Sequence, residues 1–185
     1  MAITRLGGAN AITGTLPAAN INATSLGNVD VGKVLQVVQA TKQDTQTITG
    51  SSFVEISGLQ VDITPSSTSN KILIITSLSY GATASAYPAF EIRRDDSNIF
   101  IASGTQTGSE ITFGSHSFND SIYRLGNAGH HYLDSPNTTS QVSYNIYCSP
   151  MRTSSQTVKI NRAESISDDN QCLATSVLTA YEIAG

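Results

Sequence analysis

This sequence is notable first for what it has little of. It contains no tryptophan, and charged residues make up only 13% of its 185 residues, about half the usual share in a soluble protein. The formal net charge is −4, and the few lysines and arginines form no cluster. The sequence therefore lacks the basic stripe that nucleic acids require and the basic patch that attracts anionic lipids.

Long apolar runs are also missing. No stretch approaches the eighteen or so consecutive apolar residues of a membrane-spanning helix, so we expect no membrane insertion. The N-terminal stretch MAITRLGGANAITG has no apolar core of the kind found in secretory signals. We therefore expect the chain to be made in the cytosol and, if it leaves the cell, to leave by another route.

Cysteine is scarce, with Cys148 and Cys172 both inside strand-like runs. No CxxC pair and no cluster of cysteine with histidine occurs, so a zinc site is not expected. The pattern favours two buried free thiols. A disulfide between neighbouring strands stays open, because spacing along the chain cannot decide it.

The common catalytic and cofactor motifs are absent. The sequence contains no GxSxG, no phosphate-binding loop, no HExxH and no GxGxxG. His130 and His131 are adjacent, so on a strand they face opposite sides and make a poor metal pair. His116 lies between two serines and suggests nothing specific. We expect no enzymatic activity, no cofactor and no metal.

Two other chemistries are alternatives to this expectation. A glycan-cleaving enzyme needs two carboxyl groups held several ångströms apart, and the sequence cannot pair its acidic residues, which fall on predicted turns and outward strand faces. The acidic candidates are Glu91, Glu110, Asp120, Asp134 and Glu164. Residues 95–98 (DDSN) and 167–170 (SDDN) offer oxygen ligands for calcium, but neither follows an EF-hand loop, and such residues more often form turns.

From about residue 32 onward, what the sequence does contain is a series of short runs rich in β-branched and aromatic residues, separated by polar turn clusters. This spacing is typical of all-β proteins. We expect nine to eleven strands, forming an all-β domain over residues 32–185 with the architecture of a jelly-roll-like antiparallel β-sandwich. The runs lie at 33–40, 52–65, 71–80, 89–104, 109–120, 140–150, 156–163 and 171–183.

Several local features are specific enough to test. The run KILIITSLSY at 71–80 is the most apolar, which predicts a central strand buried on both faces. Gly58 interrupts its run and suggests a β-bulge. Residues 90–101 predict a hairpin whose turn is 95–98. The segment SIYRLGNAG at 121–129 is open to one short helical turn.

Two later runs alternate with the period of a strand. The first predicts four side chains on one face: Val142, Tyr144, Ile146 and Cys148. The last run, 171–183, predicts a long strand with Leu173, Val177 and Tyr181 on one face and Ala174, Leu178 and Ala180 on the other. Three segments are candidates for exposed or partner-facing loops, namely 81–88, 103–110 and 134–139.

Residues 1–31 have a different character. Four apolar residues, Ile12, Leu16, Ile21 and Leu26, recur every four to five positions, which fits neither a helix nor a strand. A disordered leader is one interpretation, but disordered tails are usually charged and poor in isoleucine and leucine. We favour an extended anchoring arm that docks on another subunit, completing its backbone hydrogen bonds by strand addition.

Two stretches of the chain together resemble a known family. The N-terminal GGANAITGTLPAANINATSLGNV resembles the spacer and anchor segments of tail-fibre proteins from tailed bacteriophages, especially marine and cyanobacterial phages. GKVLQVVQ at 32–39, SFVEISGLQVDITPSSTSNKIL at 52–73, FEIRRDDSNI at 90–99 and TSVLTAYEI at 175–183 are similar to a β-rich module of phage virion proteins.

The resemblance implies a structural protein of the virion, assembled in the host cytoplasm. It implies a homotrimer, with the arm bound to other virion proteins and the β domain facing outward. A subunit of a tail fibre or tail appendage is the expected role. A capsid-surface decoration protein and a receptor module that binds host glycans are the alternatives.

Overall fold

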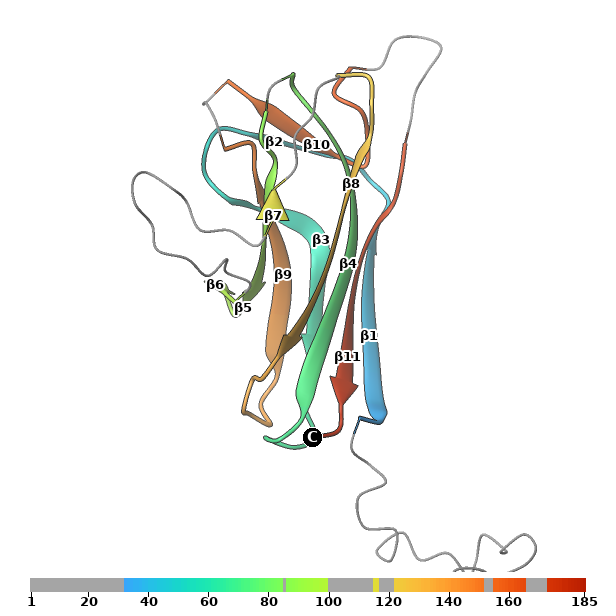
Figure 1. Cartoon of the computed structure of the whole chain (residues 1–185), viewed down its shortest axis with the longest axis vertical. Coiled ribbons are helices and arrows are strands. Elements are labelled where there is room, and N and C mark those ends of the chain that lie inside the picture. The colour runs from blue at the N-terminus through green and yellow to red at the C-terminus, as the bar shows by residue number, and fades with distance from the viewer. Residues whose placement is uncertain (1–31, 85, 100–114, 117–121, 152–154, 166–172) are drawn as a thin grey trace, which may run out of the picture.

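A computed structural model describes residues 32–84, 86–99, 115–116, 122–151, 155–165 and 173–185. Within them the chain is all-β, with two antiparallel sheets packed face to face as a β-sandwich (Figure 1). The eleven strands are β1 (Val34–Lys42), β2 (Gln46–Thr49), β3 (Val54–Ile63), β4 (Lys71–Ala82), β5 (Ala89–Arg94), β6 (Ser97–Asn98), β7 (Ser115–His116), β8 (Gly126–Asp134), β9 (Val142–Ser149), β10 (Thr157–Ile160) and β11 (Ser176–Ile183).

The first sheet, which we call sheet A, has six strands and is centred on β4. Strand β11 pairs with the first half of β4 and β10 with its last residues, while β8 runs along the opposite edge. Strand β1 lies outside β11, and β2 lies outside β10. The prediction that residues 71–80 form a central strand is therefore confirmed.

The second sheet, sheet B, has five strands in the order β3-β9-β5-β6, with β7 also paired to β5. Strand β3 contains a bulge, because Glu55 pairs with Tyr147 while Gln60 pairs with Asn145. Gly58 lies in this bulge with a φ of +81°, a conformation that glycine adopts without steric cost. The bulge expected at Gly58 is confirmed.

The core fills the space between the sheets. The predicted face of Val142, Tyr144, Ile146 and Cys148 is buried and confirmed. Sheet A contributes the alternate residues of β4 and β11, which are buried because a strand turns every second side chain inward. The buried core side chains of these two strands include Ile72, Ile74, Leu78, Leu178 and Ala180.

Other predictions needed correction. Strand β11 is shorter than predicted and begins at Ser176, although Val177 and Tyr181 do share a face opposite Leu178 and Ala180. The predicted hairpin turn is also shorter. Only Asp95 and Asp96 form it, because both adopt positive φ values of 48° and 65°, as a two-residue hairpin loop requires.

The end of β11 and the beginning of β1 lie at the same end of the sandwich (Figure 1). The Gly32 amide donates to the Ala184 carbonyl, and the Ala184 amide donates to the Lys33 carbonyl, both at 2.9 Å. The segment 1–31 therefore joins the sandwich beside the C-terminal residues of the domain.

Candidate functional site

The outward face of sheet A carries apolar side chains where a solvated sheet face would carry polar ones. One continuous row crosses four strands, because Val37 is paired with Tyr181, Tyr181 with Leu73 and Leu73 with Leu133. Ile183 and Ile75, with half-buried or exposed side chains, border this row on its two sides. We call this surface the apolar face.

Three of these six side chains are exposed within the chain, and Leu73, Tyr181 and Ile183 are half-buried. Leu133 is 55% exposed, Val37 53%, and Ile75 41%. The prediction that residues 71–80 are buried on both faces is therefore wrong. The strand has apolar residues on both faces, and a strand covered by protein on both sides would have the same sequence pattern. Contiguous exposed apolar surface of this kind marks interaction sites in soluble proteins.

The predicted anchor residues of the arm, Ile12, Leu16, Ile21 and Leu26, lie outside the described residues. Gly32 is the first described residue and lies next to the start of β1. Val34, the first residue of β1, is 49% exposed and pairs with Ile183. The arm thus joins the domain at one end of the apolar face.

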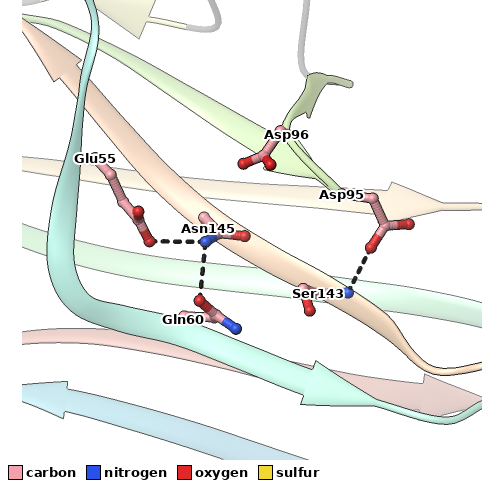
Figure 2. A pocket seen from close by; sticks show the side chains of 6 residues that line it. All are labelled: Glu55, Gln60, Asp95, Asp96, Ser143 and Asn145. Carbon is pink, nitrogen blue, oxygen red and sulfur yellow. Dashed lines mark hydrogen bonds between the residues drawn. The ribbon is translucent and has the colours of Figure 1, made fainter.

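A second surface feature lies on the outward face of sheet B. It is a hollow of about 450 Å³, which we call the polar hollow, and Figure 2 shows the six side chains that line it. They come from the two neighbouring strands β3 and β9 and from the turn after β5: Glu55, Gln60, Asp95, Asp96, Ser143 and Asn145.

The bulge in β3 builds one side of the polar hollow. It brings Glu55 and Gln60, five positions apart, to the same residue of β9. Asn145 Nδ2 donates to Glu55 Oε1 at 2.8 Å and to Gln60 Oε1 at 3.1 Å (Figure 2). Asn145 is nearly buried, so these bonds fix the floor of the hollow.

The turn of the β5–β6 hairpin builds the other side. Asp95 Oδ1 accepts from the Ser143 amide at 2.9 Å, and Asp96 Oδ1 accepts from the Tyr147 hydroxyl at 2.9 Å. The Arg93 guanidinium lies 3.8 Å from the centre of the Tyr147 ring. Tyr147, whose ring is stacked against the Arg93 guanidinium in a cation–π contact, therefore lies beside the carboxylate oxygens of the hollow.

One carboxyl group beside the hollow, that of Asp62, is stabilised in its ionised form. Hydrogen bonds from Ser143 and then Gln60 lower the pKa of Asp62 beside the hollow. Burial and the hydrogen bond to Asp96 raise the pKa of Tyr147, so its hydroxyl stays protonated at neutral pH. The hollow therefore offers anionic and amide acceptors with few free donors, a surface suited to hydroxyl-rich ligands.

The three described acidic candidates for glycan cleavage each have a separate partner. Glu91 lies on β5 and pairs with Arg93 at 2.7 Å, whereas Glu164 accepts from Thr157 Oγ1 at 2.8 Å. Asp134 was expected on a turn or an outward face, but it is 5% exposed at the end of β8. Glu110 and Asp120 lie outside the described residues.

The inward position of Asp134 has a structural explanation. Its Oδ2 accepts from Arg94 Nη1 at 2.6 Å and from the Tyr144 hydroxyl at 2.7 Å. Asp134 belongs to sheet A, whereas Arg94 and Tyr144 belong to sheet B. The three side chains therefore tie the two sheets together at one end of the sandwich, and the carboxylate is paired as buried charges must be.

The histidine and cysteine predictions have mixed outcomes. His131 is exposed while His130 is half-buried, so they do face opposite sides, and burial followed by the charge of His131 lowers the pKa of His130. Cys148 is a fully buried free thiol whose pKa burial raises. Cys172 and His116 carry no described side chain.

The predicted partner-facing loops are only partly exposed. In 81–88, Gly81 and Ala82 belong to β4, while Ala86 and Pro88 are buried. In 134–139, Asp134 belongs to β8. The loop 103–110 and the calcium candidate 167–170 lie outside the described residues.

Within the described ranges, no three histidine, cysteine or acidic side chains gather in a way that could hold a metal ion. The same ranges contain no helix long and apolar enough to cross a membrane. No protein-family profile and no curated protein matches this chain.

Proposed function

We propose that this chain is a non-enzymatic structural protein of a bacteriophage particle, a subunit of a trimeric tail fibre or tail appendage. Its N-terminal arm, through Ile12, Leu16, Ile21 and Leu26, docks on other virion proteins. The sandwich faces outward from the site of attachment. The alternative is that the chain has the same structural role on the capsid surface, as a decoration protein.

The observation that carries this proposal is the apolar face. A monomeric protein in water gains nothing from presenting Val37, Ile75 and Leu133 to solvent, whereas a subunit buries such side chains on assembly. The resemblance of both the arm and the β-rich segments to phage fibre proteins supports the virion as the assembly.

We further propose that the sandwich is a jelly roll. Its main strands order as β1-β11-β4-β8 in one sheet and β3-β9-β5-β7 in the other. Consecutive strands mostly cross between the sheets, as expected when two Greek keys fold into a double-sheet barrel. This order supports the architecture expected from the short, evenly spaced strands of the sequence.

Particle composition tests the structural role. Mass spectrometry of purified particles is expected to find the intact chain in a fixed copy number. Particles that lack the chain would overturn the structural role.

Deletion of residues 2–28 tests the docking role of the arm. The shortened chain is expected to keep the β-sheet circular dichroism of the intact chain and to be missing from particles. Incorporation of the shortened chain at the normal copy number would contradict docking through the arm.

The polar hollow favours a second function, binding of a host surface glycan. Sugar hydroxyls donate to carboxylate and amide oxygens, and Tyr147 offers a ring against which a sugar can stack. A glycan array with the intact chain tests this function, with Gln60→Ala and Asn145→Ala as variants that disturb the hollow. Binding that both variants abolish supports it, and an array without any hit contradicts it.

A further inference from the structure

The apolar face is large enough to accommodate more than a single extended segment. It spans β1, β11, β4 and β8, and the first and last of these strands have nine residues each. Four strands of that length cover roughly 600 Å² in projection. A stable interface buries about 800 Å² on each partner, and side-chain relief makes the accessible area larger than the projection.

The apolar face also carries almost no charge. Among the outward positions of its four strands, all of them described, Lys71 has the one formal charge, and its Nζ donates to Ser135 Oγ at 2.8 Å. Other outward side chains at its margins are small or neutral, as with Gln39, Ser77 and Asn127. A face of this composition meets an identical face without like-charge repulsion.

The outward face of sheet B is different. It carries Glu55, Arg93 and the acidic turn at 95–96, together with Glu91, which is 5% exposed and pairs with Arg93. The two faces of one small sandwich thus differ sharply in ionic character. The face of sheet B has the composition of a solvated surface, whereas the face of sheet A has the composition of an interface core.

We infer that the occupant of the apolar face is a second copy of this chain, and that the row Val37–Tyr181–Leu73–Leu133 is the centre of the contact. An extended arm is one strand wide and would leave most of the four strands uncovered. In the proposed trimer, each copy turns sheet A toward the shared axis, and sheet B with its polar hollow faces solvent. The threefold symmetry rests on the proposed function, but the self-contact does not.

Sedimentation velocity of the purified full-length chain tests this inference. The wild type is expected to sediment as one discrete oligomer at micromolar concentration. Leu133→Asp places a carboxylate in the centre of the contact, where it would be buried without a partner, and is expected to weaken self-association by more than about 100-fold. Since Leu133 is exposed within one chain, the variant is expected to keep the circular dichroism spectrum and melting behaviour of the monomer fold.

Leu173→Asp is the matched control, because Leu173 is 67% exposed and lies outside the apolar face, where it pairs with Arg162. This variant is expected to remain oligomeric. A monomeric wild type, or an oligomer that Leu133→Asp leaves intact, would overturn the inference. Neither outcome bears on whether the chain is found in purified particles, so failure of the self-contact and failure of the virion role can be told apart.

Discussion

At the scale of single residues, Asn161 holds together parts of the chain that are far apart in sequence. It is fully buried with a φ of 63°. Its Nδ2 donates to the Lys42 carbonyl at 2.8 Å and to the Asp44 carbonyl at 2.9 Å, while its Oδ1 accepts from Ser176 Oγ at 2.7 Å. One side chain thus connects the end of β10, the β1–β2 turn and the start of β11.

We therefore expect Asn161→Ala to lower the free energy of unfolding by about 3 kcal/mol, because it leaves buried polar groups without partners and removes a residue type that tolerates positive φ. Urea denaturation measures the loss. Asn127→Ala is the control, since Asn127 is exposed and makes one long bond of 3.3 Å to Ser77. A loss at Asn161 no larger than at Asn127 would contradict this role.

Glu182 predicts a dependence of stability on pH. Its Oε1 accepts from the Ser66 amide at 2.6 Å and from Asn70 Nδ2 at 2.6 Å. Burial alone would raise the pKa of Glu182, but the hydrogen bonds from Asn70 and Ser66 outweigh it, and the pKa is lowered. A glutamate in an unfolded chain has a pKa of about 4.3.

Because the folded state holds the ionised form, the stabilisation by Glu182 is fully present above that unfolded-state value and is lost as the pH falls through the lower folded-state pKa. We expect Glu182→Gln to be less stable than wild type by about 1 kcal/mol at pH 7 and to approach wild type near pH 3. Urea midpoints across this range measure the difference. An equal gap at every pH would show that the charge plays no part.

At the scale of the elements, the strands that alternate most regularly were predicted best. Residues 142–148 follow period two without interruption, and the structure buries the predicted face. The sequence does not predict strand β8 and allows a helical turn at its first residues, because Gly126, Asn127, Gly129 and two histidines have low strand propensity. Its strand conformation comes from pairing along β4, which no local signal shows.

The sequence could not predict the polar hollow for a related reason. Its lining residues lie near positions 55–60, 95–96 and 143–145, and they meet only when β3, β9 and β5 pair in the observed register. The predicted bulge at Gly58 and the predicted turn at 95–98 were the available signals, but no signal in the sequence marked Asn145, which lies between them in the fold. The prediction that residues 71–80 are buried on both faces was wrong because an exposed interface strand has the same composition as a strand covered within its own chain.

Strand β4 passes very close to the loop after β10, and a substitution at Gly81 tests whether this close approach matters for stability. A Cβ at Gly81 would lie 2.6 Å from Ala163 Cα, from the Arg162 carbonyl oxygen and from the Glu164 nitrogen. Since backbone atoms cannot give way cheaply, we expect Gly81→Ala to destabilise the fold by about 3 kcal/mol.

Gly129→Ala is the matched substitution in a neighbouring strand. Its Cβ would meet Thr76 O at 3.7 Å, an ordinary contact, and alanine reduces the flexibility of the unfolded chain. We expect its melting temperature to equal or exceed that of wild type. Similar losses in the two variants would mean that the close approach at Gly81 does not matter.

At the scale of the whole molecule, the two outer surfaces of the sandwich differ in chemistry. Sheet A presents the apolar face beside the point where the arm joins, and sheet B presents the polar hollow. In the assembly that we propose, each subunit buries sheet A against its copies, attaches through the arm and leaves the hollow exposed. The buried link of Asp134 with Arg94 and Tyr144 holds the two sheets in this relation.

The most direct test of this account is a cryo-electron microscopy reconstruction of the phage particle to which we propose this chain belongs. The account predicts three copies of the 19.5 kDa chain around one axis, with Val37, Leu73 and Leu133 of each copy turned inward and the segment 1–31 in contact with a neighbouring protein. Separate copies whose sheet A faces solvent would contradict it.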